Sequence, residues 1–305
     1  MNVLDLFSGI GGFTLGLEAA GMSTTAFCEC EEHAIKVLNK NFKNVPVHTD
    51  VKTITKEWIN RNEKQIDLIC GGFPCQDVSI AGKRKGIEQG EKSGLWREFK
   101  RLIEELKPRY ALIENVAGLL SGGIEIVLSD LSKIGYDATW TTLDSQYFGV
   151  PQRRRRVYIL AVRDGIPADS DIFRFNERNS AELRKEMEAV SKSRTWDFKE
   201  RKGIKYPFAY YTRQRSDQFN CLGVASTLAK RDYKSFTDLV VDSEGVRRVT
   251  PQERLLLQGF PQDFFDGCDI SVKDQFTLNG MSVPVVKWIG ERVIEFDKGL
   301  KNNEH

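Results

Sequence analysis

The first half of the chain alternates short apolar runs with stretches in which apolar residues recur every three or four positions. The apolar runs predict β-strands, and the periodic stretches predict amphipathic helices. The predicted strands are residues 3–7, 24–29, 66–70, 110–116, 140–145 and 156–162, and the predicted helices are residues 13–21, 33–42, 99–107 and 124–135. Such alternation is typical of an α/β fold with a mostly parallel sheet and helices on both faces.

The pattern changes after residue 163. Residues 164–246 are polar and rich in arginine and lysine, with only short β-like pieces, and helical spacing returns at 250–260 and 283–296. We therefore predict a core domain formed by residues 1–163 and 247–305. A smaller domain at residues 164–246 interrupts it.

The composition is that of an ordinary soluble globular protein, because the 305 residues are 40% hydrophobic and 29% charged. No apolar stretch approaches the ~18 residues that span a bilayer, and the amino-terminal residues do not resemble a signal peptide. The six cysteines lack the paired spacing of a zinc site. These features favour a protein of the reducing cytoplasm without a disulfide framework, a metal site or a membrane segment.

Charge is distributed unevenly, although the net charge is only +2. Residues 151–250 contain 22 Lys and Arg against 14 Asp and Glu, a formal +8, and the totals of 45 and 43 leave 23 against 29, or −6, elsewhere. A basic block on a mildly acidic body suits a polyanionic partner. The alternative is a solvated charged surface, and charge alone does not separate the two.

A glycine-rich turn follows the first predicted strand. The sequence DLFSGIGGF places Gly9, Gly11 and Gly12 between a strand and a helix, where the backbone can approach a ligand and helix N–H groups lie beyond. Glu29, at the end of the second strand, suits the hydroxyls of a ribose, and Asp50, near the end of a third, could accept a hydrogen bond from an adenine amino group. Dinucleotide enzymes use similar turns, and either acid could instead cap a loop.

A cysteine in the run GGFPCQ is the strongest chemical signal. Cys75 follows a proline in a turn that closes the apolar run 66–70, so its side chain is expected to be displayed. A thiolate there could act as a nucleophile, although a cysteine is more often a small buried hydrophobe. Glu114 ends the next strand, in an ENV triplet. Because the carboxyl ends of neighbouring strands share one crevice in an open α/β sheet, we expect Cys75 and Glu114 to face each other.

The run QRRRR enters the last of these strands. Successive side chains of a strand point to opposite faces, so Gln152, Arg154 and Arg156 should share one face and Arg153 and Arg155 the other. One face can point to the active site while the other meets phosphate or solvent. Four arginines often form a solvated patch, but their place at the entry to an apolar strand favours a functional role.

Together these motifs resemble those of the DNA (cytosine-5)-methyltransferases of bacteria and phages. The matching segments are DLFSGIGGF, GGFPCQ, ENV, QRRRR, RRVTPQERLLLQGFP (247–261) and TLNGMSVPVV (277–286), and KRKGIEQGEKSGLW (83–96) corresponds to the family's mobile loop. The resemblance covers nearly all of the chain apart from residues 164–246. It implies the Rossmann-like fold of S-adenosylmethionine-dependent methyltransferases, with a smaller target-recognition domain at 164–246.

The resemblance implies methyl transfer from S-adenosylmethionine to carbon 5 of a cytosine that is flipped out of a specific duplex DNA sequence. Cys75 would attack carbon 6 of the ring and form a covalent adduct. Glu114 would hold ring nitrogen 3 and the exocyclic amine, and Arg154 would hold the ring carbonyl oxygen. Gln152 and Arg156 would complete the catalytic set.

The resemblance also implies two sets of binding residues and no metal ion. Within the cofactor set, Phe7 would pack on the adenine, Pro74 would shape the pocket and Leu95 would close over the cofactor. The cofactor set is Phe7, Gly9, Gly11, Gly12, Glu29, Asp50, Val51, Pro74, Leu95 and Ser282. The DNA-binding set is Ser79, Lys83, Lys85, Arg213, Arg215, Thr227, Lys230, Arg231 and Tyr233.

Two positions depart from the family's pattern. Met281 stands where the family usually has the asparagine of a Gly-Asn-Ser/Ala-Val run, and Asn279 lies two residues earlier. The cofactor contact of that asparagine is therefore in doubt. Cys30 follows the ribose-binding acid where the family often has a bulky residue, so one wall of the adenine pocket is expected to be thinner.

Two other functions stay open at this point. One is an RNA-directed cytosine-5 enzyme on the same scaffold. The other is a catalytically silent DNA-binding relative, which the intact Cys75, Glu114, Gln152 and Arg154 argue against. The expected partner is double-stranded DNA, with a restriction endonuclease as a functional partner, and we expect a monomer in the cytoplasm of a bacterial or phage-infected cell.

Overall fold

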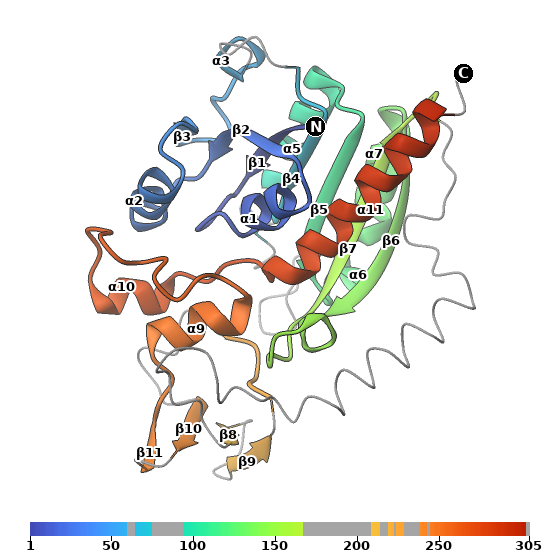
Figure 1. Cartoon of the computed structure of the whole chain (residues 1–305). Helices are drawn as coiled ribbons and strands as arrows, with labels where there is room; N and C mark the ends of the chain where they lie inside the picture. Colours follow the sequence, from blue (N-terminus) through green and yellow to red (C-terminus); the bar gives the residue numbers. More distant parts are fainter. Residues whose placement is uncertain are drawn as a thin grey trace.

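The core of the protein is a seven-stranded sheet with the strand order β3-β2-β1-β4-β5-β7-β6 (Figure 1). The structure is a computed structural model, and it describes residues 1–59, 65–74, 94–166, 209–213, 219–222, 224–228, 238–242 and 245–302. The strands of the sheet are β1 (Asn2–Leu6), β2 (Ser23–Cys28), β3 (Val47–His48), β4 (Leu68–Gly71), β5 (Tyr110–Val116), β6 (Tyr136–Asp144) and β7 (Arg155–Arg163).

Most of the sheet is parallel. The strands β3, β2, β1, β4 and β5 pair in parallel, whereas β7 runs antiparallel to both of its neighbours, β5 and β6. The predicted α/β fold is therefore confirmed. Because β7 is reversed, its amino end lies at the same edge of the sheet as the carboxyl ends of the parallel strands.

Helices cover both faces of this sheet. The helices of the described chain are α1 (Gly12–Ala19), α2 (Glu32–Asn41), α3 (Lys56–Ile59), α5 (Leu95–Leu106), α6 (Leu119–Gly122), α7 (Ile124–Lys133), α9 (Pro251–Gln258), α10 (Val272–Thr277) and α11 (Val283–Asn302), with the short 3-10 helix η2 at Ser145–Phe148. The helices α1 and α11 pack together on one face, and α5 and α7 lie on the other. Within the described chain, no helix is long and apolar enough to cross a membrane.

The period of two along the strands separates these two apolar layers. In β5, Ala111 and Ile113 belong to the cluster that contains Phe99 of α5, whereas Tyr110 and Leu112 belong to the cluster that contains Leu17 of α1. Burial on both faces explains why the strand sequences are nearly continuous apolar runs. The core therefore fixes the edge of the sheet where the polar motifs gather.

A second sheet of four strands, in the order β11-β10-β8-β9, lies next to α9 (Figure 1). Its strands are β8 (Ala209–Arg213), β9 (Phe219–Leu222), β10 (Asp238–Asp242) and β11 (Gly245–Arg248). Thr250 and Glu253 form a capping box at the start of α9, and Arg247 of β11 contacts the Glu253 carboxylate at 2.8 Å. This contact joins the small sheet to the helix that leads back into the core domain.

Candidate active site

The glycine-rich turn after β1 is built from unusual backbone conformations. Gly9 and Gly11 have φ angles of 54° and 86°, and Phe7, which is not a glycine, has a φ of 53°. Non-glycine residues seldom adopt the left-handed region, and such positions are often found at functional sites. The turn ends at Gly12, the first residue of α1.

Glu29 is locked onto this turn by main-chain donors. Its Oε2 accepts a hydrogen bond from the Gly9 nitrogen at 2.7 Å. Its Oε1 accepts from the nitrogens of Cys30 at 2.9 Å and Glu31 at 2.8 Å. Three N–H donors fix the direction of the carboxylate and leave about one of its four lone-pair sites, on Oε2, as an acceptor for a ligand.

Asp50 and Val51 lie beside the end of β3, which is only two residues long. Asp50 is exposed, and its Oδ1 accepts a hydrogen bond from the Lys52 nitrogen at 2.9 Å. Val51 is buried, and its carbonyl oxygen accepts from Nη2 of Arg101 at 2.9 Å. Asp50 is therefore accessible to a ligand, while Val51 anchors the loop that presents it.

Phe7, in the glycine-rich turn, and Leu95 both pack against the apolar cluster that contains Phe99. The ring of Phe7 stacks on that of Phe99, with the centroids 6.2 Å apart. Leu95 begins α5 and, like Phe7, packs half-buried against the same apolar cluster. Both side chains are half-buried, so part of each remains exposed.

The segment before α11 packs directly on the glycine-rich turn. A Cβ atom at Gly12 would lie 2.7 Å from the Met281 nitrogen, so only glycine allows this approach. Ser282 is fully buried, and its hydroxyl has no hydrogen-bond partner in the described chain. Asn279 is engaged elsewhere, because its Oδ1 accepts from Nη2 of Arg254 at 2.8 Å. The missing family asparagine is therefore not replaced by Asn279, and Met281 instead receives a hydrogen bond on its sulfur from the Tyr158 hydroxyl at 3.7 Å.

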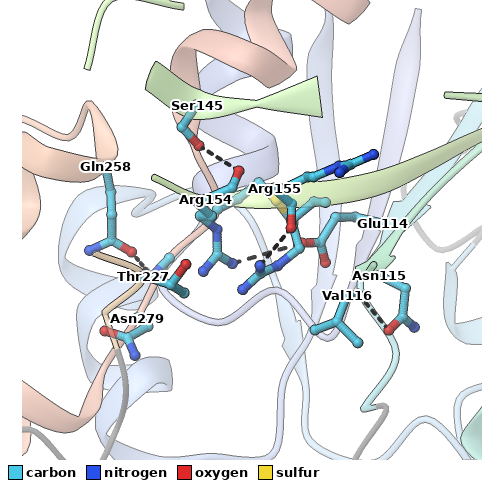
Figure 2. A network of polar contacts seen from close by, with 12 residues as sticks. Glu114, Asn115, Val116, Ser145, Arg154, Arg155, Thr227, Gln258 and Asn279 are labelled. Atoms are coloured by element: carbon cyan, nitrogen blue, oxygen red, sulfur yellow. Dashed lines mark hydrogen bonds and ion pairs between the residues drawn. The ribbon is translucent and has the colours of Figure 1, made fainter. Parts of the chain in front are cut away.

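A buried cluster of charges lies across the site from the turn. Oε1 of Glu114 is 3.0 Å from Nε of Arg156 and 3.8 Å from Nη2 of Arg154. The three side chains are 9%, 14% and 11% exposed, and Figure 2 shows the Arg154 guanidinium directed toward Glu114. Burial and, to a smaller extent, the nearby Arg156 lower the pKa of Arg154 to about 10, against the opposing effect of Glu114. An arginine with this pKa still carries its full charge at neutral pH.

This cluster is not saturated by the residues around it. Within the described chain, Oε1 of Glu114 and Nε of Arg154 are buried and form no hydrogen bond, and the contact to Arg156 is an ion pair without hydrogen-bond geometry. The side chain of Gln152 is fully buried, and both of its polar atoms also have no partner there. Unpaired buried polar atoms are costly, so these atoms are expected to find partners in a bound ligand or in ordered water.

The predicted alternation of the QRRRR run is confirmed. Gln152 is buried, Arg154 and Arg156 are half-buried, and Arg153 and Arg155 are exposed. Nη2 of Arg155 contacts the Thr142 hydroxyl at 3.3 Å on the outer face. The inward face therefore carries the three residues that sequence analysis assigned to catalysis.

The loop that leads to Cys75 is tied to β5. Nδ2 of Asn115 donates to the Phe73 carbonyl oxygen at 3.2 Å, and a Cβ atom at Gly72 would lie 2.9 Å from Oε2 of Glu114. Pro74 is the last described residue of this loop, and Cys75 lies outside the described residues. Asn115 was part of the ENV motif, but its tethering role is evident only from the fold.

Other predicted residues also lie outside the described part of the chain. They are Ser79, Lys83, Lys85, Arg215, Lys230, Arg231 and Tyr233. Arg213 belongs to β8, but its side chain is not among those described. Thr227 is described and exposed, and its hydroxyl donates to the Arg153 carbonyl oxygen at 2.6 Å. The DNA contacts of this set stay predictions.

Sequence analysis did not identify two residues that hold the main chain of Arg154. The Arg154 nitrogen donates to Oδ1 of Asp144 at 3.0 Å, and its carbonyl oxygen accepts from the Ser145 hydroxyl at 3.2 Å (Figure 2). Asp144 also caps η2 by accepting from the Gln146 nitrogen. The sequence signal was an Asp-Ser pair at the end of an apolar strand, which is too common to suggest this role.

Comparison with known proteins identifies relatives of the whole chain. A family model described as C-5 cytosine-specific DNA methylase matches residues 1–201 and 170–295. Type II methyltransferase M2.BsuMI of Bacillus subtilis is 35% identical over 311 residues, which cover 96% of this chain and 75% of the relative. Type II methyltransferase M.NgoBI of Neisseria gonorrhoeae is 33% identical over 300 residues, covering 94% and 90%. The crystal structure of the Dnmt2 methyltransferase of S. pombe has a TM-score of 0.69 at 21% identity over 97% of this chain and 98% of that one, a likeness of fold.

Proposed function

The chain belongs to the family of C-5 cytosine-specific DNA methylases, and from this we propose the reaction in detail. The enzyme transfers a methyl group from S-adenosylmethionine to carbon 5 of a cytosine that is flipped out of a specific duplex DNA sequence. The reaction passes through a covalent adduct between Cys75 and the base.

The observation that carries this proposal is the unsaturated cluster of Glu114, Arg154 and Arg156 beside the root of the Cys75 loop. A carboxylate and two guanidinium groups present an acceptor and several donors to one small region. The polar edge of a cytosine offers a carbonyl oxygen, a ring nitrogen and an amino group in one plane. A base in this cluster would supply the partners that the buried polar atoms lack.

The chemistry requires activation of the ring, because carbon 5 of cytosine is a poor nucleophile. Attack of the Cys75 thiolate on carbon 6 forms a carbon–sulfur bond and makes carbon 5 enamine-like. Glu114 stabilises the protonated ring nitrogen 3 and the exocyclic amine, and Arg154 stabilises the negative charge on the ring carbonyl oxygen. Carbon 5 then takes the methyl group. Loss of the proton on carbon 5 and expulsion of Cys75 restore the aromatic ring.

The residues around the glycine-rich turn fit S-adenosylmethionine, which supplies a methyl group activated by its sulfonium charge. The fixed carboxylate of Glu29 would accept hydrogen bonds from the ribose hydroxyls, and Asp50 would accept one from the adenine amino group. Phe7 would pack on the adenine ring. The unpartnered hydroxyl of Ser282 would bind the polar end of the molecule.

The target base must leave the duplex to reach the cluster, since its reacting carbons lie within the base stack. We assign recognition of the surrounding sequence to residues 164–246, which contain the small sheet and much of the basic block. Because named relatives are type II methyltransferases, we place the enzyme in restriction–modification, where an endonuclease with the same target would be its functional partner. We further propose that it acts as a monomer in the cytoplasm.

Methyl transfer from labelled S-adenosylmethionine to mixed-sequence duplex DNA tests this proposal, with bisulfite sequencing of the product. We expect 5-methylcytosine in one short recurring context. Competition between duplex DNA and tRNA measures which polymer is the substrate. Label that enters tRNA in place of DNA would overturn the DNA assignment, and folded protein that binds the cofactor without transferring label would indicate a silent relative.

The covalent step has its own test. Cys75→Ser should abolish turnover, because a hydroxyl is a far weaker nucleophile than a thiolate at neutral pH. Cys268→Ser is the matched control, since Cys268 lies near Phe264 and away from the site. Near-normal methylation by the Cys75→Ser variant would end the covalent mechanism.

A further inference from the structure

The turn that presents Asp50 receives little support from the strand before it, because β3 has only two residues and forms one edge of the sheet. Within the turn, the Asp50 carbonyl oxygen accepts hydrogen bonds from the nitrogens of Thr53 at 3.1 Å and Ile54 at 3.2 Å. On the side of the strand, the Asp50 nitrogen donates to Nδ1 of His48 at 3.2 Å. Residues 50–54 therefore form one unit, and its place in the protein depends on what its other side contacts.

Arg101 of α5 holds that other side of the turn. Its Nη2 donates to the carbonyl oxygen of Val51 at 2.9 Å and to that of Ile54 at 3.3 Å. A terminal guanidinium nitrogen carries two hydrogens, so a single Nη2 can serve both carbonyl groups. One side chain of α5 thus binds the main chain near both ends of the turn.

The guanidinium of Arg101 is itself fixed on α5. Its Nε is 2.8 Å from Oε2 of Glu98, and its Nη1 is 2.9 Å from Oε1 of Glu105. The two glutamates lie three residues before and four residues after the arginine on the same helix, where side chains are neighbours. The direction of Nη2 is therefore set by the helix and not by the turn that it binds.

Apolar packing also joins the turn to α5 but does not fix its orientation. Val51 and Ile54 are buried in the cluster that contains Phe99 of α5. Hydrophobic burial is non-directional, so it allows the turn to shift along the helix. The hydrogen bonds from Arg101 are directional and remove that freedom. Because Asp50 is exposed and directly precedes Val51, the position of its carboxylate follows that of the turn.

The same helix supports a second residue of the cofactor set. The ring of Phe7 stacks on that of Phe99 with the centroids 6.2 Å apart, and Arg101 follows two residues later on α5. One helix therefore supports both the residue assigned to the adenine ring and the turn that carries the residue assigned to the adenine amino group.

We propose that Arg101 is a positioning residue for cofactor recognition, which holds the Asp50 carboxylate where it accepts a hydrogen bond from the adenine amino group. This inference rests on the cofactor assignment within the proposed function. Without the two contacts from Nη2, the turn would keep its internal hydrogen bonds but lose its fixed place against α5. Recognition of the amino group would be lost, whereas methyl transfer at the Glu114 cluster would continue.

Calorimetry with two ligands tests this role. S-adenosylhomocysteine carries the same adenosine and has no methyl group to transfer, and its analogue with hydrogen in place of the adenine amino group cannot donate to Asp50. We expect the wild type to bind the analogue about tenfold more weakly, since one hydrogen bond to a charged group is lost. Arg101→Met should bind S-adenosylhomocysteine more weakly by about the same factor and should bind both ligands equally.

A conservative variant and a matched control sharpen this result. Arg101→Lys keeps a positive charge beside Glu98 and Glu105 but lacks the planar group that reaches two carbonyls as well. It should also lose the discrimination, and it carries the test if the methionine variant does not fold. Arg163→Met is the control, because Nη1 of Arg163 also donates to a main-chain carbonyl, that of Lys107, at the opposite edge of the sheet. It should keep the wild-type ratio of the two dissociation constants.

The kinetics supply a second readout. The KM of Arg101→Met for S-adenosylmethionine should rise, whereas its single-turnover rate at saturating cofactor and its KM for DNA should stay close to those of the wild type. A lower rate at saturating cofactor together with the wild-type ligand ratio would indicate general support of the fold and would overturn the proposal.

The ligand ratio decides the role of Arg101 in every case. Arg101 variants that keep the wild-type ratio, even with lower affinity for both ligands, would overturn the inference. A wild-type protein that binds both ligands equally would also overturn it, since Asp50 would then make no contact with the amino group. If either result accompanies methylation of cytosine in DNA, the inference fails alone. If the wild-type protein binds S-adenosylhomocysteine but transfers no methyl group, the proposed function fails and the ratio still tests Arg101.

Discussion

The two halves of the candidate site lie at one edge of the sheet, but one is formed mainly by main-chain groups and the other by side chains. The half around β1 and β2 is formed by backbone, with left-handed residues at Phe7, Gly9 and Gly11 and a carboxylate held by three main-chain donors. The half around β5 and β7 is formed by buried charged side chains, and several of their polar atoms have no partner in the described chain. We refer to them as the backbone half and the side-chain half.

The difference shows which of the two acids, Glu29 or Glu114, already has its hydrogen-bond partners before a ligand binds. In the backbone half, Glu29 already has its donors, so a ligand would add contacts to a fixed frame. In the side-chain half, Glu114 and Arg154 have been removed from water without full compensation, which is unfavourable for the folded protein. A substrate that supplies the missing partners gains from that deficit, which supports our proposal that the reacting base binds in the side-chain half.

The strongest test of this division into two halves is Glu114→Gln, for which we expect the largest effect. The variant keeps the shape of the side chain and removes its charge, so the protonated ring loses its anion. Loss of such stabilisation reduces rates by ~10²–10³-fold, and we expect the single-turnover rate to fall by this amount. The affinity for S-adenosylmethionine, measured by calorimetry, should change little because that ligand is assigned to the backbone half.

A surface glutamate provides the control for this variant. Glu125→Gln removes an exposed charge in the first turn of α7, and it should leave the rate unchanged. Equal effects on rate and on cofactor affinity in Glu114→Gln would contradict the division into two halves. Thermal unfolding of both variants shows whether the remaining arginines destabilise the fold.

The second test is Glu29→Gln in the backbone half, for which we expect an effect on binding instead of rate. Glutamine has an amino group in place of one carboxylate oxygen. At least one of the main-chain N–H groups that donate to Glu29 would therefore lose its acceptor. Hydrogen bonds to charged groups contribute ~1.5–3 kcal/mol, and the dissociation constant for S-adenosylmethionine should rise by about 10- to 100-fold on that basis. Isothermal titration measures it, and an unchanged dissociation constant would show that Glu29 serves only the turn.

The backbone half was largely predictable from sequence, because its determinants are local. Glycines between a strand and a helix, followed by an acid at the end of the next strand, specify a turn that a short window of sequence contains. Helices and strands are also predicted best where their determinants are local, and strand β5 has the predicted bounds, Tyr110–Val116. The strand predicted at 140–145 instead begins at Tyr136, because its first residues pair with β7 and that pairing is long-range.

The sequence predicted which charged and polar groups form the side-chain half, but not which residues hold them in place. The strand period placed Gln152, Arg154 and Arg156 on one face, as found. The Arg154 nitrogen donates to Asp144 and its carbonyl oxygen accepts from Ser145, and these contacts depend on the pairing of β6 with β7, about ten positions apart in the sequence. Nothing in the residue types signals this pairing. The contact of Met281 with Gly12 was also not predictable from the sequence, because it depends on how α11 packs against α1.

The last test concerns the stability of the fold, through a buried carboxyl in the backbone half. Asp5 on β1 is fully buried, its Oδ2 accepts from the Thr14 hydroxyl at 2.8 Å, and its Oδ1 has no partner in the described chain. Burial raises the pKa of Asp5 from 3.8 to about 7, against the lowering effect of the Thr14 hydrogen bond. In this half the buried acid therefore retains a proton up to near neutral pH, whereas arginines face the buried acid of the side-chain half.

That difference has a signature in the pH dependence of stability. Between pH 3.8 and about 7 the folded state retains the Asp5 proton that the unfolded state has lost, so the contribution of Asp5 to the free energy of unfolding falls as pH rises, by ~1.4 kcal/mol per pH unit. Above that range the contribution is constant. Asp5→Asn cannot titrate, so urea unfolding at pH 5, 6, 7 and 8 should show a less negative slope between pH 5 and 7 than the wild type. Asp137→Asn, an exposed change on β6, is the control, and parallel curves for wild type and Asp5→Asn would show that Asp5 is ionised in the folded protein.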